Sequence, residues 1–133
     1  MTKQVIAVRR DLNMRKGKLA AQVAHASMAF LSSQIRNQQG VVNDYGSSRY
    51  EIWLPRVRRE WIESSFTKVV VSVGSAEELL SLVKRAQDAG IVTHEIVDNG
   101  ATEFHGVPTL TCAAFGPDES ERLDPFTGDL PLL

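Results

Sequence analysis

Apolar residues recur along this chain with two periods, one typical of strands and one typical of helices. Residues 3–8 (KQVIAV) form a short apolar run that predicts a buried strand. From Gly17 to about Gln38 most residues are strong helix formers, and apolar side chains repeat at the spacing of one helical face. The repeating positions are Leu19, Val23, Ala26 and Phe30. We expect a long helix that packs this stripe into the core.

The middle of the chain is less regular. Residues 39–50 (QGVVNDYGSSRY) show no sustained period and are rich in turn-forming residues, so we expect a mobile loop there. Pro55 suits the first turn of a helix, and Val57 and Trp61 then fall on one helical face. A short second helix is therefore expected after Pro55.

A strand and a third helix follow. Residues 68–73 (KVVVSV) are dense in β-branched side chains, which favours a strand. Ser75 and Glu78 match a capping box at the start of a helix, and Gly90 marks the end of that helix.

Two more apolar runs, residues 91–97 and 109–115, complete a predicted set of four strands. The tail, residues 116–133, carries turn residues and a final apolar segment that we expect to pack on the sheet. Strands that alternate with helices indicate crossover connections and a mostly parallel sheet. The predicted fold class is α/β, a three-layer sandwich in which helices cover both faces of a mostly parallel, mixed four-stranded sheet. Ligands bind such sheets beyond the carboxyl ends of the strands, here near the loops 9–18 and 98–108.

Length and composition match one globular domain spanning residues 1–133, with 43% hydrophobic and 23% charged residues. No apolar run approaches the roughly 18 residues that cross a bilayer, and the start shows no signal-peptide core, so we expect a cytoplasmic protein that does not bind membranes. The single cysteine, Cys112, lies in an apolar run, which favours a buried, inert thiol over a nucleophile. One cysteine can build neither an intramolecular disulfide nor a cysteine-based zinc site.

Charge is divided unequally along the chain, although the net charge is only −1. Residues 1–68 hold 12 Lys and Arg against 5 Asp and Glu, a balance of +7, whereas residues 69–133 hold 3 against 11, a balance of −8. This asymmetry suggests a basic face that could meet a polyanion. Intermixing of the two sets by the fold is an equally good interpretation.

The start of the long helix, Arg15-Lys16-Gly17-Lys18, is basic where the helix dipole is already positive. Cations are unfavourable there unless an anion lies among them, and free backbone N–H groups together with lysines form a phosphate site. The segment does not have the spacing of a Walker A loop, so a solvated basic turn is an equally good interpretation.

Lys18, Gln22 and His25 project from one stripe of this helix, because they are spaced at i, i+4 and i+7. His25 could act as a general base, but we favour a core histidine bonded to a carbonyl. We expect Gln22 to orient a neighbour rather than to react. No pair of histidines has the spacing of a helical metal site, so no metal is expected.

Asp98 closes a predicted strand, and Thr102 and Thr109 flank the loop that follows. One carboxylate and two hydroxyls could therefore converge on Lys18 at the start of the long helix. Taken alone, an aspartate before Asn-Gly is more often only a turn former.

Read in order, several segments resemble the archaeal and eukaryotic type of peptidyl-tRNA hydrolase over nearly the whole chain. The most specific are VRRDLNMRKGKLAAQVAHA (8–26), VDNGATEF (97–104), FGP (115–117), and the tail with Asp124 and Thr127-Gly128. The resemblance implies a mixed-sheet α/β fold and a homodimer. It also implies that the chain hydrolyses the ester joining a peptide to the terminal ribose of tRNA, with neither cofactor nor metal.

The resemblance further implies functional residues. The catalytic positions fall on Lys18, Asp98, Thr102 and Thr109, with Lys16, Gln22 and His25 in support. The residues expected to bind tRNA are Arg9, Arg10, Arg15 and Lys16, with Arg56, Arg58 and Arg59 as further candidates. Our hypothesis is that Asp98, or a hydroxyl it orients, positions the attacking water, while Lys18 stabilises charge on the ester oxygens.

The chain departs from the family pattern in the loop after Asp98. Ala101 stands where relatives usually have arginine, and Glu103 where they usually have glutamine, so RNA binding is expected to be weaker or differently placed. The loop before Thr109 is one residue shorter than usual, and the connection at residues 40–50 is longer. Two other functions stay open, a noncatalytic tRNA- or RNA-binding module and, with less support, a domain that meets an acidic protein partner.

Overall fold

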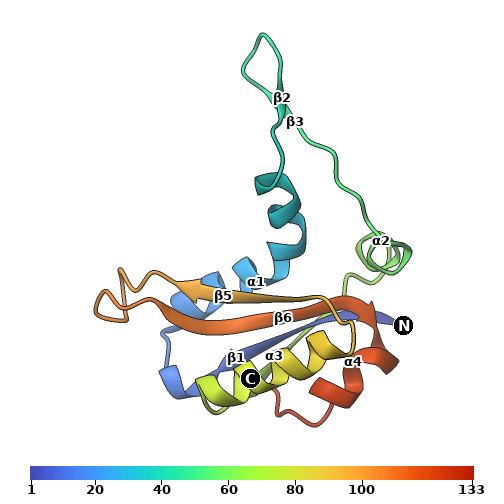
Figure 1. Cartoon of the computed structure of the whole chain (residues 1–133). Coiled ribbons are helices and arrows are strands. Elements are labelled where there is room, and N and C mark those ends of the chain that lie inside the picture. The colour runs from blue at the N-terminus through green and yellow to red at the C-terminus, as the bar shows by residue number, and fades with distance from the viewer.

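The computed structural model describes residues 1–133 and is built on a mixed four-stranded sheet of order β4-β1-β6-β5 (Figure 1). The strands are β1 (Thr2–Arg9), β4 (Lys68–Val73), β5 (Thr93–Asp98) and β6 (Thr109–Glu119). β1 runs parallel to β4, whereas β6 runs antiparallel to both β1 and β5. The expected α/β class is confirmed.

The parallel share of the sheet is smaller than expected, because only the β1–β4 pair is parallel. A helix lies on the path between β1 and β4, but only the loop 99–108 joins β5 to β6. A loop without a helix returns the chain beside itself as an antiparallel neighbour.

Helices cover both faces of the sheet, as expected (Figure 1). α1 (Lys16–Arg36) and α2 (Arg56–Glu63) lie on one face, and α3 (Ala76–Asp88) and α4 (Ser120–Thr127) on the other. The alternation of side chains along β1 divides the core between these faces. Ile6 and Val8 pack in the cluster that contains Ala26 of α1, whereas Val5 and Ala7 pack with Leu79, Leu82 and Val83 of α3.

The apolar stripe of α1 lies in the core, as predicted. Ala26 and Phe30 are buried, and Leu19 and Val23 are partly buried against the same cluster. Trp61 of α2 is buried as well. Its ring meets Phe30 edge-on at 5.8 Å between centroids, so α1 and α2 form one layer.

Two expected irregular regions contain structure. The loop at residues 39–50 holds a hairpin of β2 (Val41–Val42) and β3 (Ser48–Arg49), which projects away from the sheet beyond α1 (Figure 1). The tail contains α4. No helix was predicted there, because the tail carries turn residues and has a proline at position 125. A short 3-10 helix, η1 (Arg10–Leu12), links β1 to α1.

The two edges of the sheet differ. The last apolar segment packs on β4, as expected, where Ser72 N–H donates to Pro131 O at 2.8 Å and Leu133 N–H donates to Val70 O at 3.1 Å. β5 pairs only with β6, so its outer edge carries no strand. None of the helices combines the length and the hydrophobicity needed to cross a bilayer.

Candidate active site

Lys18 and Asp98 form an ion pair at the carboxyl end of β5. The Nζ of Lys18, in the first turn of α1, donates to Oδ1 of Asp98 at 2.7 Å and to Oγ1 of Thr102 at 2.9 Å. The two charged side chains are only 13% and 11% exposed. Three of the residues expected to be catalytic are therefore brought together, and solvent screens this pair less than an exposed one.

Further donors surround the carboxylate of Asp98. Gly100 N–H donates to Oδ2 at 2.8 Å, and Gln22 Nε2 donates to Oδ1 at 3.2 Å. The hydrogen bond from Lys18, followed by the one from Gly100, lowers the pKa of Asp98 below its ordinary value of 3.8. Asp98 is therefore an anion throughout the physiological range.

Gly100 determines the path of the loop that holds Thr102. It has a positive φ of 82°, and a Cβ atom there would lie 2.4 Å from the carbonyl oxygen of Val107. Glycine alone fits both restrictions. Gly106 N–H closes the loop by donating to Gly100 O at 2.9 Å, so the Asn-Gly turn predicted from the sequence also positions the site.

Thr111 is a site residue that the sequence did not reveal. It is fully buried, and its hydroxyl donates to Oε1 of Gln22 at 2.6 Å, while the amide nitrogen of Gln22 bonds to Asp98. The β5–β6 register shifts between Ile96 and Val97, beside Thr111, as in a β-bulge. In the sequence, only the position of the Thr111 hydroxyl within the apolar run 109–115 could have indicated this role.

Thr109 lies apart from the hydrogen-bonded cluster. It is opposite Asp98 in the β5–β6 ladder, but its hydroxyl donates to Val107 O at 2.8 Å. Phe104, which sequence reasoning also missed, places its ring centroid 5.7 Å from the Nζ of Lys18. That distance suits a cation–π contact, so Phe104 forms part of the wall around the lysine.

The favoured interpretation of His25 as a core residue was wrong, because its side chain is exposed. Gln22 is buried and points toward the sheet, but His25 lies three positions further on and is turned about 60° from Gln22, on the side away from the core stripe. His25 instead lines a cavity beside the site.

The basic residues expected to bind tRNA are not equally available. Arg9 is held by Asp11 at 2.7 Å and donates to Leu110 O at 3.0 Å. The guanidinium of Arg15, 90% exposed, lies 3.9 Å from the carboxylate of Glu103. Arg10 and Lys16 are exposed and have no ion-pair partner.

Intermixing of the two charge sets is therefore part of the fold. Lys3, Arg15 and Lys18 from the basic half pair with acids from the acidic half. The further candidates on α2 lie toward the N-terminus of the chain, at the opposite end of the sheet from the loop 99–108 (Figure 1). The basic surface beside the site is smaller than the sequence suggested.

Cys112 is buried, as predicted, and burial raises the pKa of its thiol to about 11. The thiol packs against Gln22 O, with Sγ 3.4 Å away. No group of three or more His, Cys, Asp and Glu side chains is arranged to hold a metal ion. The groups that meet at the site are an ammonium, a carboxylate and a hydroxyl.

Comparison with known proteins identifies a family and several similar proteins. The family model described as Peptidyl-tRNA hydrolase PTH2 matches residues 2–133. A peptidyl-tRNA hydrolase from Metallosphaera sedula is 40% identical over 131 residues, which cover 98% of this chain and 99% of that protein. One from Thermoplasma acidophilum is 37% identical over 131 residues, covering 98% and 97%, and one from Saccharolobus islandicus is 38% identical over the full length of both proteins.

A solved structure of a protein of unknown function from Agrobacterium tumefaciens has a TM-score of 0.56 at 12% identity, covering 99% of this chain and 97% of that one. At that identity the likeness concerns the fold alone. The family match and the three hydrolases carry the assignment, and they confirm the resemblance in the sequence motifs. This chain belongs to the peptidyl-tRNA hydrolase PTH2 family.

Proposed function

We propose that this protein hydrolyses the ester bond between the peptide and the tRNA of peptidyl-tRNA, or of an N-blocked aminoacyl-tRNA. The observation that carries the proposal is the cluster of Lys18, Asp98 and Thr102, built from segments far apart in the chain. The hydrolases to which the chain is similar support the same reaction.

Lys18 supplies the electrostatic part of this mechanism. An ammonium group has three donors, of which two are directed at Asp98 and Thr102. The third donor is available to the ester oxygen, on which negative charge develops as water attacks. An ammonium group paired with a carboxylate is suited to stabilising negative charge rather than to accepting a proton, so this role suits Lys18 better than that of a base.

Asp98 and Thr102 position the attacking water. Asp98 is too weak a base to take a proton fully, since several donors lower its pKa, but a carboxylate oxygen can still accept a hydrogen bond from water. Thr102 accepts from Lys18 and keeps its own proton to donate. Thr109 can donate to the substrate or to water only if its hydroxyl leaves Val107 O.

Gln22 and His25 act in support. Gln22 holds the carboxylate of Asp98 in place from a buried position. His25 is exposed beside the site, where it can contact the substrate.

The tRNA backbone is bound at the start of α1. The first turn of α1 contains no acidic residue and its cap, Arg15, makes no side-chain capping bond, so the helix dipole and the free N–H groups favour a phosphate there. Arg10, Arg15 and Lys16 supply further cations. Arg9 contributes less, because Asp11 already occupies its guanidinium. Such contacts hold the backbone without reading sequence.

The proposal extends to a cytoplasmic location, since peptidyl-tRNA arises in translation. It also extends to a homodimer. Support for self-association comes from exposed apolar side chains around a cavity of about 560 Å³ between α1 and β4, among them Met28, Phe66 and Leu133. Light scattering should then give twice the monomer mass. Leu133→Asp should lower this mass, whereas Leu80→Asp, an exposed leucine on α3, should not.

The direct test is hydrolysis of N-acetylated aminoacyl-tRNA, with and without a metal chelator. We expect turnover in both conditions. Binding of tRNA without turnover would assign the chain to the rival class of noncatalytic RNA-binding modules. Turnover that disappears with the chelator would contradict a metal-free mechanism.

A further inference from the structure

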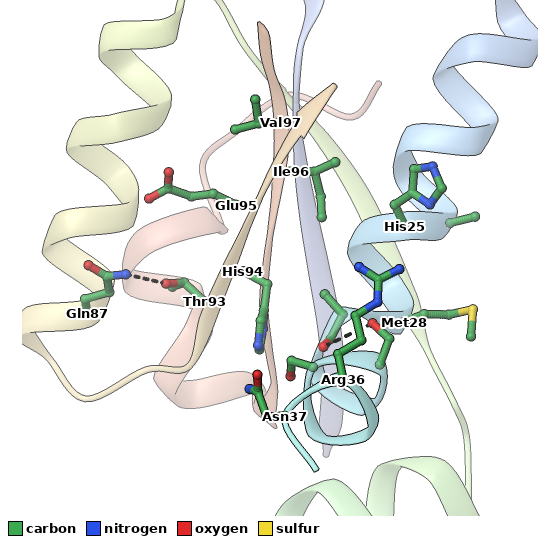
Figure 2. Close-up of a pocket in the computed structure, with 14 residues that line it drawn as sticks. His25, Met28, Arg36, Asn37, Gln87, Thr93, His94, Glu95, Ile96 and Val97 are labelled. Atoms are coloured by element: carbon green, nitrogen blue, oxygen red, sulfur yellow. Dashed lines mark hydrogen bonds between the residues drawn. The ribbon is translucent and has the colours of Figure 1, made fainter. Parts of the chain in front are cut away.

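A cavity of about 860 Å³ lies between α1 and β5 and follows the outer edge of β5 (Figure 2). Near the Lys18–Asp98 pair it is lined by His25 of α1 and by Val97, the neighbour of Asp98 in β5. At its far end it reaches Arg36, in the last turn of α1. Neither Lys18 nor Asp98 lines the cavity, but Val97 directly precedes Asp98, so the cavity adjoins the candidate active site and leads away from it.

The cavity wraps around the unpaired edge of the sheet. Figure 2 shows His94 and Ile96 on the side of β5 that faces α1, and Thr93 and Glu95 on the other side. An unpaired edge strand presents a row of free backbone N–H and C=O groups. An extended peptide can add to such an edge as a further strand, through main-chain hydrogen bonds.

His94 lines the same cavity. Its Nδ1 is buried and has no hydrogen-bond partner in the protein, so a peptide in the cavity could meet only the other ring nitrogen, Nε2. Burial, and then the charge of Arg58, lower the pKa of His94, so the ring is neutral near pH 7. A neutral imidazole has one donor and one acceptor and can bond to a peptide group in either sense.

The chemistry of the substrate indicates which molecule binds in the cavity. The scissile ester joins two parts that must leave the Lys18–Asp98 pair in different directions. The unpaired cations Arg10 and Lys16 lie before or at the N-terminus of α1, whereas the cavity runs toward the C-terminus of this helix. The RNA thus has cationic partners on one side of the pair, and the other side is left for the peptide.

Given the proposed hydrolase activity, we propose that the peptide of peptidyl-tRNA lies in this cavity as a strand added in parallel to β5. The ester is at the C-terminal carbonyl of the peptide, beside Asp98, which is the carboxyl end of β5. Peptide and strand therefore both run toward the site. The 6 residues of β5 span roughly 20 Å at about 3.3 Å per residue, so about five to six peptide residues fill the edge. Because this pairing uses main-chain hydrogen bonds, it can accept any peptide sequence.

The first experiment is a length series with wild-type protein. N-acetyl-glycyl-tRNA is compared with tRNAs carrying two to eight glycines, and each oligoglycine with the corresponding oligosarcosine, in which the backbone N–H groups are methylated. We expect kcat/KM to rise at least tenfold up to about five residues and then to level. Oligosarcosine should lose this gain, and equal values across both series would overturn the proposal. Absence of hydrolysis for every substrate would refute the hydrolase function itself, and the inference with it.

The second experiment blocks the far end of the cavity. Ser32→Trp and Arg36→Trp place an indole along its wall, and Ser81→Trp places one on an exposed position of α3 outside it. The two cavity variants should raise KM at least tenfold for pentaglycyl-tRNA and leave turnover of N-acetyl-glycyl-tRNA unchanged, with Ser81→Trp equal to wild type for both. Equal loss for both substrates in both cavity variants, or none, would overturn the proposal. A change in molecular mass by light scattering with Ser32→Trp would assign the edge to a second copy of the chain instead.

Discussion

The ammonium of Lys18 lies 2.7 Å from the carboxylate of Asp98, although the two residues are 80 positions apart in the chain. One stands in the first turn of α1 and the other at the end of β5, so the contact exists only in the folded protein. Both side chains are largely buried, and each retains capacity to bind other groups.

The ionisation of Asp98 should reflect its donors. Because the pKa is lowered, the stability that this carboxylate contributes is complete above its ordinary value of 3.8 and is lost as pH falls through the still lower folded value. Carboxyl NMR titration should give a midpoint below 3.8 in wild type, and Lys18→Met should raise it. A wild-type midpoint above 3.8 would contradict the hydrogen-bond pattern at Asp98.

Thr111 should act on Asp98 through Gln22. Thr111→Val removes the donor to a buried amide oxygen, which should cost about 1–3 kcal/mol in the free energy of unfolding. The freed Gln22 should also hold Asp98 less well, lowering kcat by about 10- to 100-fold with KM unchanged. Urea titration and steady-state kinetics measure the two effects. Thr111→Ser keeps the hydroxyl and should restore kcat. If Thr111→Val is destabilised but has wild-type kcat, Thr111 is only structural.

Glu103 should weaken RNA binding by neutralising Arg15. Its carboxylate lies 3.9 Å from the exposed guanidinium, and exposed ion pairs are worth about 0.2–1 kcal/mol. Glu103→Gln should therefore tighten tRNA binding by up to about fivefold at low salt, with a smaller gain at high salt. Glu121→Gln, which removes the same charge from exposed α4, is the control in a filter-binding titration. An equal gain in both variants would indicate an effect of net charge alone.

Cys112 should be chemically inert in the folded protein. The thiol is buried and its pKa is raised to about 11, so almost none is thiolate at pH 8. Iodoacetamide at pH 8 should label the protein in urea but not in buffer, by mass spectrometry. Cys112→Ala should keep wild-type turnover. Rapid labelling of the folded protein would show that β6 opens readily.

Most of the fold could be predicted because its elements follow local periods. The apolar stripe of α1, the β-branched run of β4 and the cap at Ser75 each act over a few residues. Ser75 Oγ accepts from Glu78 N–H at 3.1 Å, as the capping box requires. The direction of β6 depends instead on how the loop 99–108 returns the chain. The spacing of apolar residues carries no information about that path.

The site was partly predictable for a similar reason. Lys18, Asp98 and Thr102 occupy the ends of elements, where ligands bind α/β sheets, so their convergence followed from the expected topology. Thr111 was missed because threonine is an ordinary strand residue, and only the position of Gln22 makes its hydroxyl a partner. His25 was misplaced because a small rotation about the helix axis separates a buried position from an exposed one.

The central claim is that Lys18 and Asp98 act as one catalytic unit, and a double-mutant cycle tests it most directly. Single-turnover hydrolysis of N-acetyl-aminoacyl-tRNA is measured for wild type, Lys18→Ala, Asp98→Ala and the double variant, with tRNA affinity measured in parallel. Each single change should slow hydrolysis of bound substrate by about 10²- to 10³-fold, and the double variant should be little slower than either. Losses that multiply, or weaker tRNA binding with hydrolysis of bound substrate unchanged, would contradict the account.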